Sequence, residues 1–356
     1  MRILLLATDA YGGHGGIALF NRELCAALRE HEVTVVPRVI RDEVRDVPPH
    51  VRFVAEAARG KLAYLREVTR LRFERFDLVI CGHINLLPVA WNEPVLVVHG
   101  IEAWQSRRRS LAKCRGVISV SALTRDRLLA WSHYDGPVHV LPNAVHLERY
   151  GIRPRRRDLV ERFGLEKKRV LLTVGRLDAR ERSKGFDEVM DVLPQLPDDV
   201  VYMIAGGGDD FPRLQAKAVA LGLGTRVVFT GLFSEDDKPD LYNLADVYVM
   251  PSRGEGFGFV FLEAMACGVP VIGSSIDGGR EALLGGALGT LVDPADGDAI
   301  RDAILAALAK GERTIPAGLE YFAFERFAER VSAIVTALRG ESTRGRAADS
   351  PSTPER

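Results

Sequence analysis

The chain has 356 residues, of which 47% are hydrophobic, and its 48 Lys and Arg balance its 48 Asp and Glu. This length accommodates two domains, and no apolar run is long enough to span a bilayer. Its four cysteines form no Cys-x-x-Cys pair and do not stand beside histidine in metal-ligand spacing, so we predict reduced, mostly buried thiols and neither zinc nor disulfides.

Short apolar runs alternate with helical patterns along nearly the whole chain. Before residue 143, strands are predicted at 3–7, 33–37, 78–81, 95–99, 117–120 and 138–141, with helices at 17–29, 62–73 and 124–131. Later strands are predicted at 170–174, 200–205, 227–230, 247–250 and 269–273, and helices at 186–196, 212–221, 238–243, 259–266 and 298–309. This alternation is typical of parallel sheets with helices on both faces, which gives two doubly wound α/β domains.

Domain boundaries follow from breaks in this pattern. The stretch 151–158 has a run of arginines with Pro and Gly but no apolar periodicity, so it is predicted to be a linker between domains 1–157 and 158–323. Apolar residues at helical spacing in 324–340 predict a terminal helix, and the polar tail 341–356 is expected to be disordered. Two such domains are expected to face a cleft with the carboxyl ends of their strands.

The run EGFGFVFLE follows the strand 247–250 and is bounded by Glu255 and Glu263. Gly256 and Gly258 have no Cβ, so their backbone can approach a ligand closely. A helix that begins between Phe257 and Phe259 points its N-terminal amides at the same place, which favours an anion. An anion site flanked by two carboxylates suits a ligand with both phosphates and hydroxyls, such as a nucleotide sugar.

Two cations occupy matching places at the start of the second half. Arg176 follows the strand 170–174, and Lys184 precedes the helix that begins at 186. Taken alone, they are ordinary surface cations; beside the two carboxylates they favour a site for a leaving diphosphate. In the N-terminal glycine loop, Gly15 and Gly16 stand at a helix start and are predicted to contact phosphate or acceptor.

Taken together, these motifs resemble the Glu-x7-Glu motif, the basic pair and the first glycine loop of retaining GT-B glycosyltransferases, family 4 (glycosyl transferases group 1). The resemblance implies a GT-B fold whose terminal helix crosses back to the first domain. It also implies that Glu263 binds the ribose, that the loop of Gly256, Phe257 and Gly258 lines the donor sugar and phosphates, and that His99 contacts the donor sugar. Glu255 is then expected to position the sugar and stabilise charge without acting as a nucleophile.

The expected activity is retaining transfer of a hexose, such as mannose, glucose or N-acetylglucosamine, from a UDP- or GDP-sugar to a glycan or lipid-linked acceptor. No metal, other cofactor or nucleic acid is expected. One alternative is a non-catalytic nucleotide-sugar binder of the same fold. Another is a sugar-nucleotide epimerase or dehydrogenase, which the missing Gly-x-Gly-x-x-Gly dinucleotide fingerprint disfavours. The acids at 235–237 either contact the base or cap a helix, so the donor nucleotide stays open.

Charge is unevenly distributed between the halves. Residues 1–157 hold 25 Lys and Arg against 16 Asp and Glu, and the remainder holds 23 against 32. The cluster of Arg107, Arg108, Arg109, Lys113 and Arg115 beside Trp104 is either a solvated helix face or a docking surface for an anionic membrane or a lipid-diphosphate acceptor. We therefore expect a cytoplasmic protein, either free or peripheral at the inner face of the plasma membrane.

Overall fold

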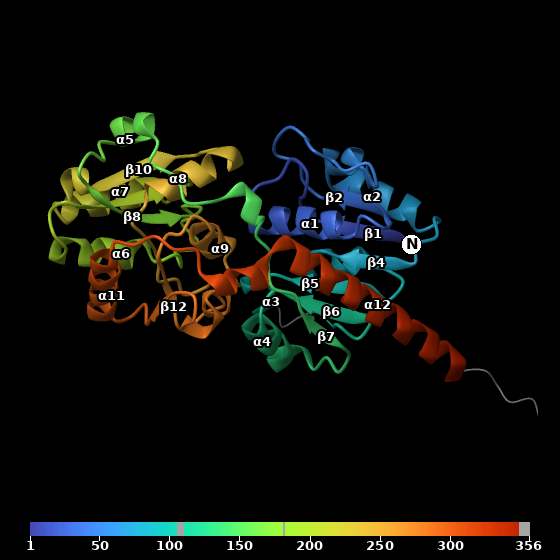
Figure 1. Ribbon diagram of the computed structural model, residues 1–356. Helices are drawn as coiled ribbons and strands as arrows, with labels where there is room; N and C mark the ends of the chain where they lie inside the picture. Colours follow the sequence, from blue (N-terminus) through green and yellow to red (C-terminus); the bar gives the residue numbers. More distant parts are fainter. Residues whose placement is uncertain (105–109, 181, 349–356) are drawn as a thin grey trace, which may run out of the picture. The chain divides into compact units, whose positions relative to one another are not determined.

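A computed structural model describes residues 1–104, 110–180 and 182–348. The chain divides into two compact units (Figure 1). Unit 1 comprises Met1–Asn143 together with the chain from Phe324, and unit 2 comprises Ala144–Ala323. Among the described residues, no helix is both long and apolar enough to cross a membrane.

Unit 1 is built on a parallel sheet with the strand order β3-β2-β1-β4-β5-β6-β7. Its strands are β1 (Arg2–Ala7), β2 (Glu32–Pro37), β3 (Val51–Phe53), β4 (Leu78–Cys81), β5 (Val95–Val98), β6 (Gly116–Ser119) and β7 (Val138–Val140). The strands β4, β5 and β6 are buried along their whole length, as expected for strands covered on both faces. Strand order reverses between β1 and β4, and ligands of doubly wound folds bind outside the carboxyl ends of strands at such a point.

The helices of unit 1 include one from the far end of the sequence. They are α1 (Gly16–Ala27), α2 (Lys61–Leu71), α3 (Ile101–Trp104), α4 (Ala122–Ser132) and α12 (Phe324–Ala348), with 3₁₀ turns at Ala55–Arg59 and Ile84–Val89. The α12 helix packs on α1, where the rings of Phe20 and Phe327 meet edge to face at 5.9 Å between centroids. This confirms the return of the terminal helix to the first domain.

The terminal helix is longer than predicted. It continues to Ala348, whereas residues 341–356 were expected to be disordered. The sequence after Gly340 includes Glu, Arg and Ala, which propagate a helix that tertiary packing has already nucleated. Residues 349–356 lie outside the described part of the chain.

Unit 2 has a second parallel sheet with the strand order β10-β9-β8-β11-β12-β13. Its strands are β8 (Arg169–Val174), β9 (Val200–Ala205), β10 (Val227–Gly231), β11 (Val247–Met250), β12 (Val271–Ser274) and β13 (Thr290–Val292). Its helices are α5 (Arg157–Phe163), α6 (Phe186–Val192), α7 (Phe211–Ala220), α8 (Lys238–Leu244), α9 (Phe259–Ala266), α10 (Gly279–Ala282) and α11 (Gly297–Lys310), and short 3₁₀ turns include Leu147–Arg149, Leu193–Gln195, Gly224–Arg226, Glu235–Asp237, Leu284–Gly286 and Ala317–Phe322. The order reverses between β8 and β11, so the loops after these strands are the expected ligand edge.

The boundary between the units falls after Asn143, earlier than the predicted boundary between residues 157 and 158. The arginine stretch 151–158, which the sequence predicts to be a linker, is bound to unit 2. Arg155 pairs with Asp246, Arg156 Nη1 lies 2.9 Å from Asp240 Oδ2, and α5 begins at Arg157. Cations without apolar periodicity resemble a linker in sequence, but two of them here have carboxylate partners far along the chain, as for Arg155 and Asp246 with a separation of 91 residues.

Candidate functional site

Glu255 lies in the loop between β11 and α9, and Glu263, the other member of the predicted carboxylate pair, lies within α9 itself. Gly258 precedes α9 with φ of +91°, and a Cβ there would lie 2.7 Å from the Phe261 ring and 3.2 Å from Glu255 Cγ. Glycine is therefore required for this turn. The Phe257 side chain is buried and packs edge to face on Phe322 at 5.5 Å, so only its backbone is available to a ligand.

Lys184 and Glu255, 71 residues apart in sequence, form an ion pair. Their segments are packed main chain to main chain: Arg253 N donates to Ser183 O at 2.7 Å, and a Cβ on Gly185 would lie 2.7 Å from Pro251. The side chains of Lys184 and Glu255 are 28% and 16% exposed, so a ligand can reach both. The structure thus brings one predicted phosphate-binding cation onto the predicted sugar-binding carboxylate.

Arg176 lies just after the carboxyl end of β8, as predicted, and is close to the carboxylate of Asp178. Its Nε is 3.4 Å from Asp178 Oδ2, and its side chain is 65% exposed. The glycine turn after β9 supports this segment, because a Cβ on Gly206 would lie 2.0 Å from Gly175 O and one on Gly208 would lie 2.0 Å from Leu177 O. These contacts explain the 206–208 glycines as packing positions at the strand ends.

Glu263 is buried on α9 and held by two side chains of α8. Lys238 Nζ lies 3.1 Å from Glu263 Oε1, and the Tyr242 hydroxyl donates to Glu263 Oε2 at 2.6 Å. Burial, and then the charge of Glu263, holds the pKa of Tyr242 well above its usual value, so Tyr242 stays a donor. Burial lowers the pKa of Lys238, but the charges of Glu263 and Glu235 outweigh burial, and the net shift is upward.

Sequence reasoning missed Lys238 and Tyr242 as neighbours of Glu263. The signal was present, since the two are spaced i and i+4 in a predicted helix and therefore share one face. Which face meets α9 depends on packing between helices, which a single sequence does not specify.

In unit 1, Gly15 and Gly16 begin α1, as predicted. Gly15 has φ of +83°, and no atom lies within 4 Å of the place where a Cβ would stand, so its backbone borders open space. Arg22 Nη1 holds the preceding loop by donating to Ala10 O and Gly13 O, each at 3.0 Å. Glycine is favoured at position 15 by backbone conformation, and the free space beside it is compatible with a ligand.

His99 follows β5 and is held by its own unit. Its Nε2 lies 3.0 Å from Gly82 O, and since a carbonyl only accepts, Nε2 carries the proton and Nδ1 is left as an acceptor. Burial lowers the pKa of His99, although the charge of Glu102 opposes this shift. A neutral ring that already donates through Nε2 can accept a hydrogen bond from a ligand at Nδ1.

Two acidic segments of unit 2, residues 234–237 and 296–298, lie at helix starts. Ser234 Oγ accepts from Asp237 N at 3.2 Å, and Asp296 caps α11 by accepting from Ala299 N at 2.9 Å, so both acidic stretches lie at helix starts. Glu235 pairs with Lys238 at 2.8 Å. Within residues 1–104, 110–180 and 182–348, no cluster of three His, Cys, Asp or Glu side chains is arranged to hold a metal ion.

The structure describes two cations of the basic cluster of unit 1, Lys113 and Arg115. Arg107, Arg108 and Arg109 lie outside the described residues. Lys113 Nζ donates to Leu87 O and Ala90 O at 2.5 and 3.1 Å, and the Arg115 side chain is 15% exposed and 3.7 Å from Glu93. Lys113 and Arg115 are therefore tied to unit 1 itself and do not form an open cationic surface.

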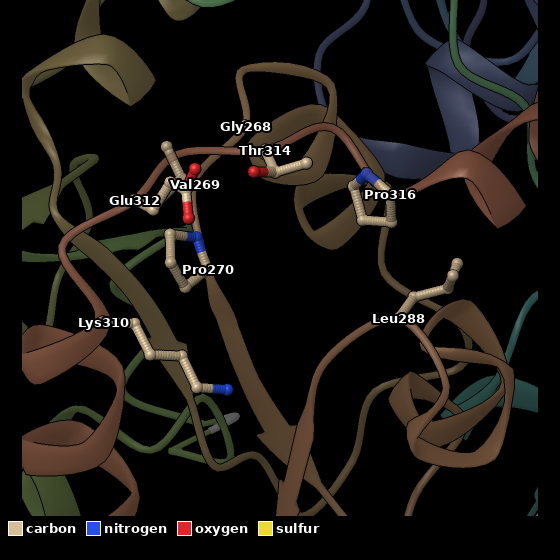
Figure 2. Close-up of a pocket in the computed structure, with 8 residues that line it drawn as sticks. All are labelled: Gly268, Val269, Pro270, Leu288, Lys310, Glu312, Thr314 and Pro316. Atoms are coloured by element: carbon tan, nitrogen blue, oxygen red, sulfur yellow. The ribbon is translucent and has the colours of Figure 1, made fainter.

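A cavity of about 360 Å³ in unit 2 lies elsewhere (Figure 2). It is bounded by the residues just before β12 and by the segment that follows α11, and its lining consists of Gly268, Val269, Pro270, Leu288, Lys310, Glu312, Thr314 and Pro316. It therefore opens at the amino end of β12, whereas the predicted site residues of unit 2 gather at the carboxyl ends of strands. None of the predicted site residues lines it.

Two family models match consecutive parts of the chain. The model described as Glycosyltransferase Family 4 matches residues 14–149, and the model described as Glycosyl transferases group 1 matches residues 156–315. The chain belongs to the group 1 glycosyltransferases. The Anabaena Alr3699/HepE structure in complex with UDP and glucose superposes with a TM-score of 0.74 at 21% identity, covering 94% of this chain and 99% of that one. This likeness confirms the GT-B fold.

Curated relatives of this group 1 glycosyltransferase share less of its length. A GDP-mannose-dependent alpha-(1-6)-phosphatidylinositol monomannoside mannosyltransferase of Mycolicibacterium smegmatis is 36% identical over 214 residues, which is 57% of this chain and 55% of the relative. An alpha-D-kanosaminyltransferase of Streptomyces kanamyceticus is 33% identical over 150 residues, 42% of this chain and 39% of the relative. The chain thus spans about half the length or less of these curated relatives.

Proposed function

We propose that this chain is a retaining hexosyltransferase that moves a hexose from a nucleotide diphosphate sugar to a glycan or lipid-linked acceptor without a metal ion. The observation that carries the proposal is the cluster of unit 2, where the Lys184–Glu255 pair and the buried Glu263 occupy the ligand edge of a parallel sheet. Relatives that transfer sugars, among them the GDP-mannose-dependent enzyme of Mycolicibacterium smegmatis, support the same reading.

In this proposal the diphosphate is stabilised by fixed positive charge. As the bond between sugar and phosphate breaks, negative charge grows on the leaving diphosphate, and preorganised cations lower the barrier. Lys184 lies on the segment before α6, so its ammonium adds to the positive end of that helix. Arg176, exposed at the end of β8 beside Asp178, is the second cation that we assign to the diphosphate.

The two carboxylates have different tasks. Glu255 pairs with Lys184 and is partly exposed. Once Lys184 turns to the diphosphate, the Glu255 carboxylate is left to stabilise the positive charge that develops on the sugar ring. Glu263 is almost fully buried and accepts from Lys238 and Tyr242, with Tyr150 beside it, and its remaining lone-pair capacity suits a ribose hydroxyl. The acceptor then attacks from the same side that the diphosphate leaves, and a phosphate oxygen takes its proton.

GDP-mannose is the donor to test first, because the first relatives that match this chain use it. Binding of GDP, UDP, ADP and TDP, measured by thermal shift with and without EDTA, tests the donor site. At about 100 times the dissociation constant, a ligand stabilises the folded state by about 2.7 kcal/mol. A shift with one nucleotide that persists in EDTA supports the proposal, and no shift with any of them contradicts it.

The same measurements separate the alternatives. A non-catalytic binder of the same fold would be stabilised by a sugar nucleotide but would neither transfer nor hydrolyse it. An epimerase would convert the sugar while it remains on the nucleotide, which NMR of the recovered nucleotide sugar would reveal.

We also propose a peripheral position at the inner face of the plasma membrane, since a lipid-linked acceptor would lie there. On the exposed side of α2, Leu62 is 83% exposed, and Phe73, just beyond the helix, is 88% exposed, with the exposed Lys61 and Arg75 nearby. Apolar side chains among cations are typical of surfaces that meet anionic lipid. Flotation with anionic liposomes tests this position: loss of binding in the L62E/F73E variant supports it, and absence of binding by the wild type contradicts it.

A further inference from the structure

Asp277 is a buried carboxylate that the proposed chemistry does not use. It lies between β12 and α10, at the carboxyl end of β12, and its exposed fraction is 0%. An ionised group without access to water is costly unless hydrogen bonds replace its hydration. Its partners therefore indicate why this position carries an acid.

Two of its three hydrogen-bond donors, Ser252 and Glu255, lie in the loop between β11 and α9, and the third, Gly279, is the first residue of α10. Ser252 Oγ and Glu255 N both donate to Asp277 Oδ2, at 2.7 and 2.9 Å, and Gly279 N donates to Oδ1 at 3.0 Å. One carboxylate thus joins the main chain of Glu255 to the first residue of α10.

The two segments are also pressed together along their backbones. Gly278 N donates to Glu255 O at 2.8 Å, and a Cβ on Gly278 would lie 2.1 Å from Gly256 O. The backbone of Glu255 is therefore held on both its N–H and its C=O by residues 277–278, while its side chain is held by Lys184. Among the described residues, Lys184 is the side chain that pairs with the Glu255 carboxylate, so once Lys184 turns to a diphosphate the Glu255 backbone contacts hold this residue in place.

We propose that Asp277 is a positioning residue, which fixes the backbone of Glu255 so that the Glu255 carboxylate keeps its place when Lys184 turns to the donor diphosphate. The inference rests on the proposed function. It assigns Asp277 no contact with the substrate.

Asp277 also makes the loop sensitive to pH. Burial, and less strongly the charge of Glu255, raises the pKa of Asp277 to about 6, while its hydrogen bonds with Ser252, Glu255 N and Gly279 N act in the opposite direction. The charged groups around it are Glu255 with its partner Lys184 on one side, and Arg280 and Glu281 next along its own chain. Protonation of Asp277 turns one acceptor oxygen into a hydroxyl, so the hydrogen bonds that hold the Glu255 backbone weaken below about pH 6. Because the pKa is raised in the folded state, the same protonation favours folding, and a loss of activity there is not unfolding caused by this group.

The test compares wild type with Asp277→Asn and with Asp296→Asn, a matched control in which another aspartate accepts from a backbone N–H at a helix start. An asparagine at 277 offers one acceptor oxygen, and its amide nitrogen opposes a backbone donor. Hydrogen exchange of the peptide 252–258 and the kinetics of sugar transfer are measured from pH 5 to 8, together with the dissociation constant of the nucleoside diphosphate.

For Asp277→Asn we expect faster exchange confined to 252–258 and kcat lowered about 10- to 100-fold, as misplacement of a reacting group produces. The nucleoside diphosphate should bind within about threefold of wild type, and the acid limb of the wild-type kcat profile near pH 6 should disappear. Unchanged exchange and kcat, an unchanged acid limb, or exchange that rises across the whole chain would overturn the proposal. If wild type binds no nucleotide, the proposed function fails instead, and the exchange data alone then decide whether Asp277 holds the loop.

Discussion

Replacing Glu263 with Gln tests the assignment of the ribose site, because its expected effect on nucleotide binding is larger than its expected effect on folding stability. The substitution keeps the shape of a side chain that is 3% exposed but removes its charge. Lys238 keeps a second carboxylate, Glu235, at 2.8 Å, so no buried ammonium is left unpaired. We therefore expect a modest loss of folding stability, about 1–2 kcal/mol, against the about 3–5 kcal/mol expected when a buried pair loses one partner.

The effect on nucleotide binding should be larger than that on folding. A hydrogen bond to an ionised group contributes about 1.5–3 kcal/mol, and about 1.4 kcal/mol corresponds to a factor of ten in affinity. The dissociation constant of the preferred nucleoside diphosphate should therefore rise about 10- to 100-fold in Glu263→Gln. Glu235→Gln, which alters the exposed partner of the same lysine, should change it less than threefold, about 0.6 kcal/mol.

Isothermal titration with ribo- and deoxyribonucleotides identifies the group that Glu263 binds. If Glu263 holds ribose hydroxyls, the deoxy compound should bind wild type more weakly than the ribo compound, and this difference should shrink in Glu263→Gln, because the same contact is already lost. Equal weakening of ribo- and deoxynucleotide binding by the substitution would refute the assignment, since Glu263 would then act on another part of the ligand or on the fold.

Three further predictions follow from particular contacts. Lys184→Ala should weaken binding of the nucleoside diphosphate about 10- to 100-fold in a titration. The control Lys310→Ala, in the cavity of Figure 2, should leave the dissociation constant unchanged. Equal changes of the dissociation constant in the two variants would contradict a place for Lys184 in the donor site. Burial lowers the pKa of His99 in the folded state, so as the pH falls through about 6.5 the unfolded chain takes up the imidazole proton first and the folded state loses stability. The melting temperature of His99→Gln should therefore fall less steeply with acid than that of wild type. Parallel plots of melting temperature against pH for the two proteins would contradict this. Gly278→Ala should lower the free energy of unfolding by about 1–3 kcal/mol in a denaturant titration, because its Cβ would lie 2.1 Å from Gly256 O. The control Gly297→Ala, whose Cβ would lie 3.6 Å from Val192, should stay within about 0.5 kcal/mol of wild type. Equal stability of the two variants would contradict the close packing of residues 277–278 on the loop.

The sequence was sufficient for the architecture because buried parallel strands are nearly continuous apolar runs. The strands β4 and β11, four apolar residues each, are predicted at the residues where they occur. The edge strands β3 and β13 were missed, since each has three residues, too few for a run or an alternation to stand out from the neighbouring sequence. The predicted boundary at residue 157 reflects the same limit, because the contacts of Arg155 with Asp246 and of Arg156 with Asp240 join residues that are distant in sequence.

The candidate site was predictable in its residue types but not in its pairings. The spacing of Glu255 and Glu263 is local, and the helix between them is visible in the sequence. The contacts that fix these carboxylates are long-range: Lys184 meets Glu255 across 71 residues, and Tyr242 meets Glu263 across 21. Asp277 had no signal of its own, since an acid before two glycines is typical of an exposed turn and only packing reveals that it is buried.

Proton NMR of the sugar released or transferred from GDP-mannose and from UDP-glucose, in the presence of EDTA, tests the central claim most directly. It needs no knowledge of the acceptor, because donor hydrolysis also reports the stereochemistry when enough enzyme is used for release of the sugar to outpace mutarotation. The proposed function predicts that the α anomer appears first from one of these donors at an undiminished rate without metal. A β anomer first, or turnover that requires a divalent ion, would contradict a metal-independent retaining glycosyltransferase.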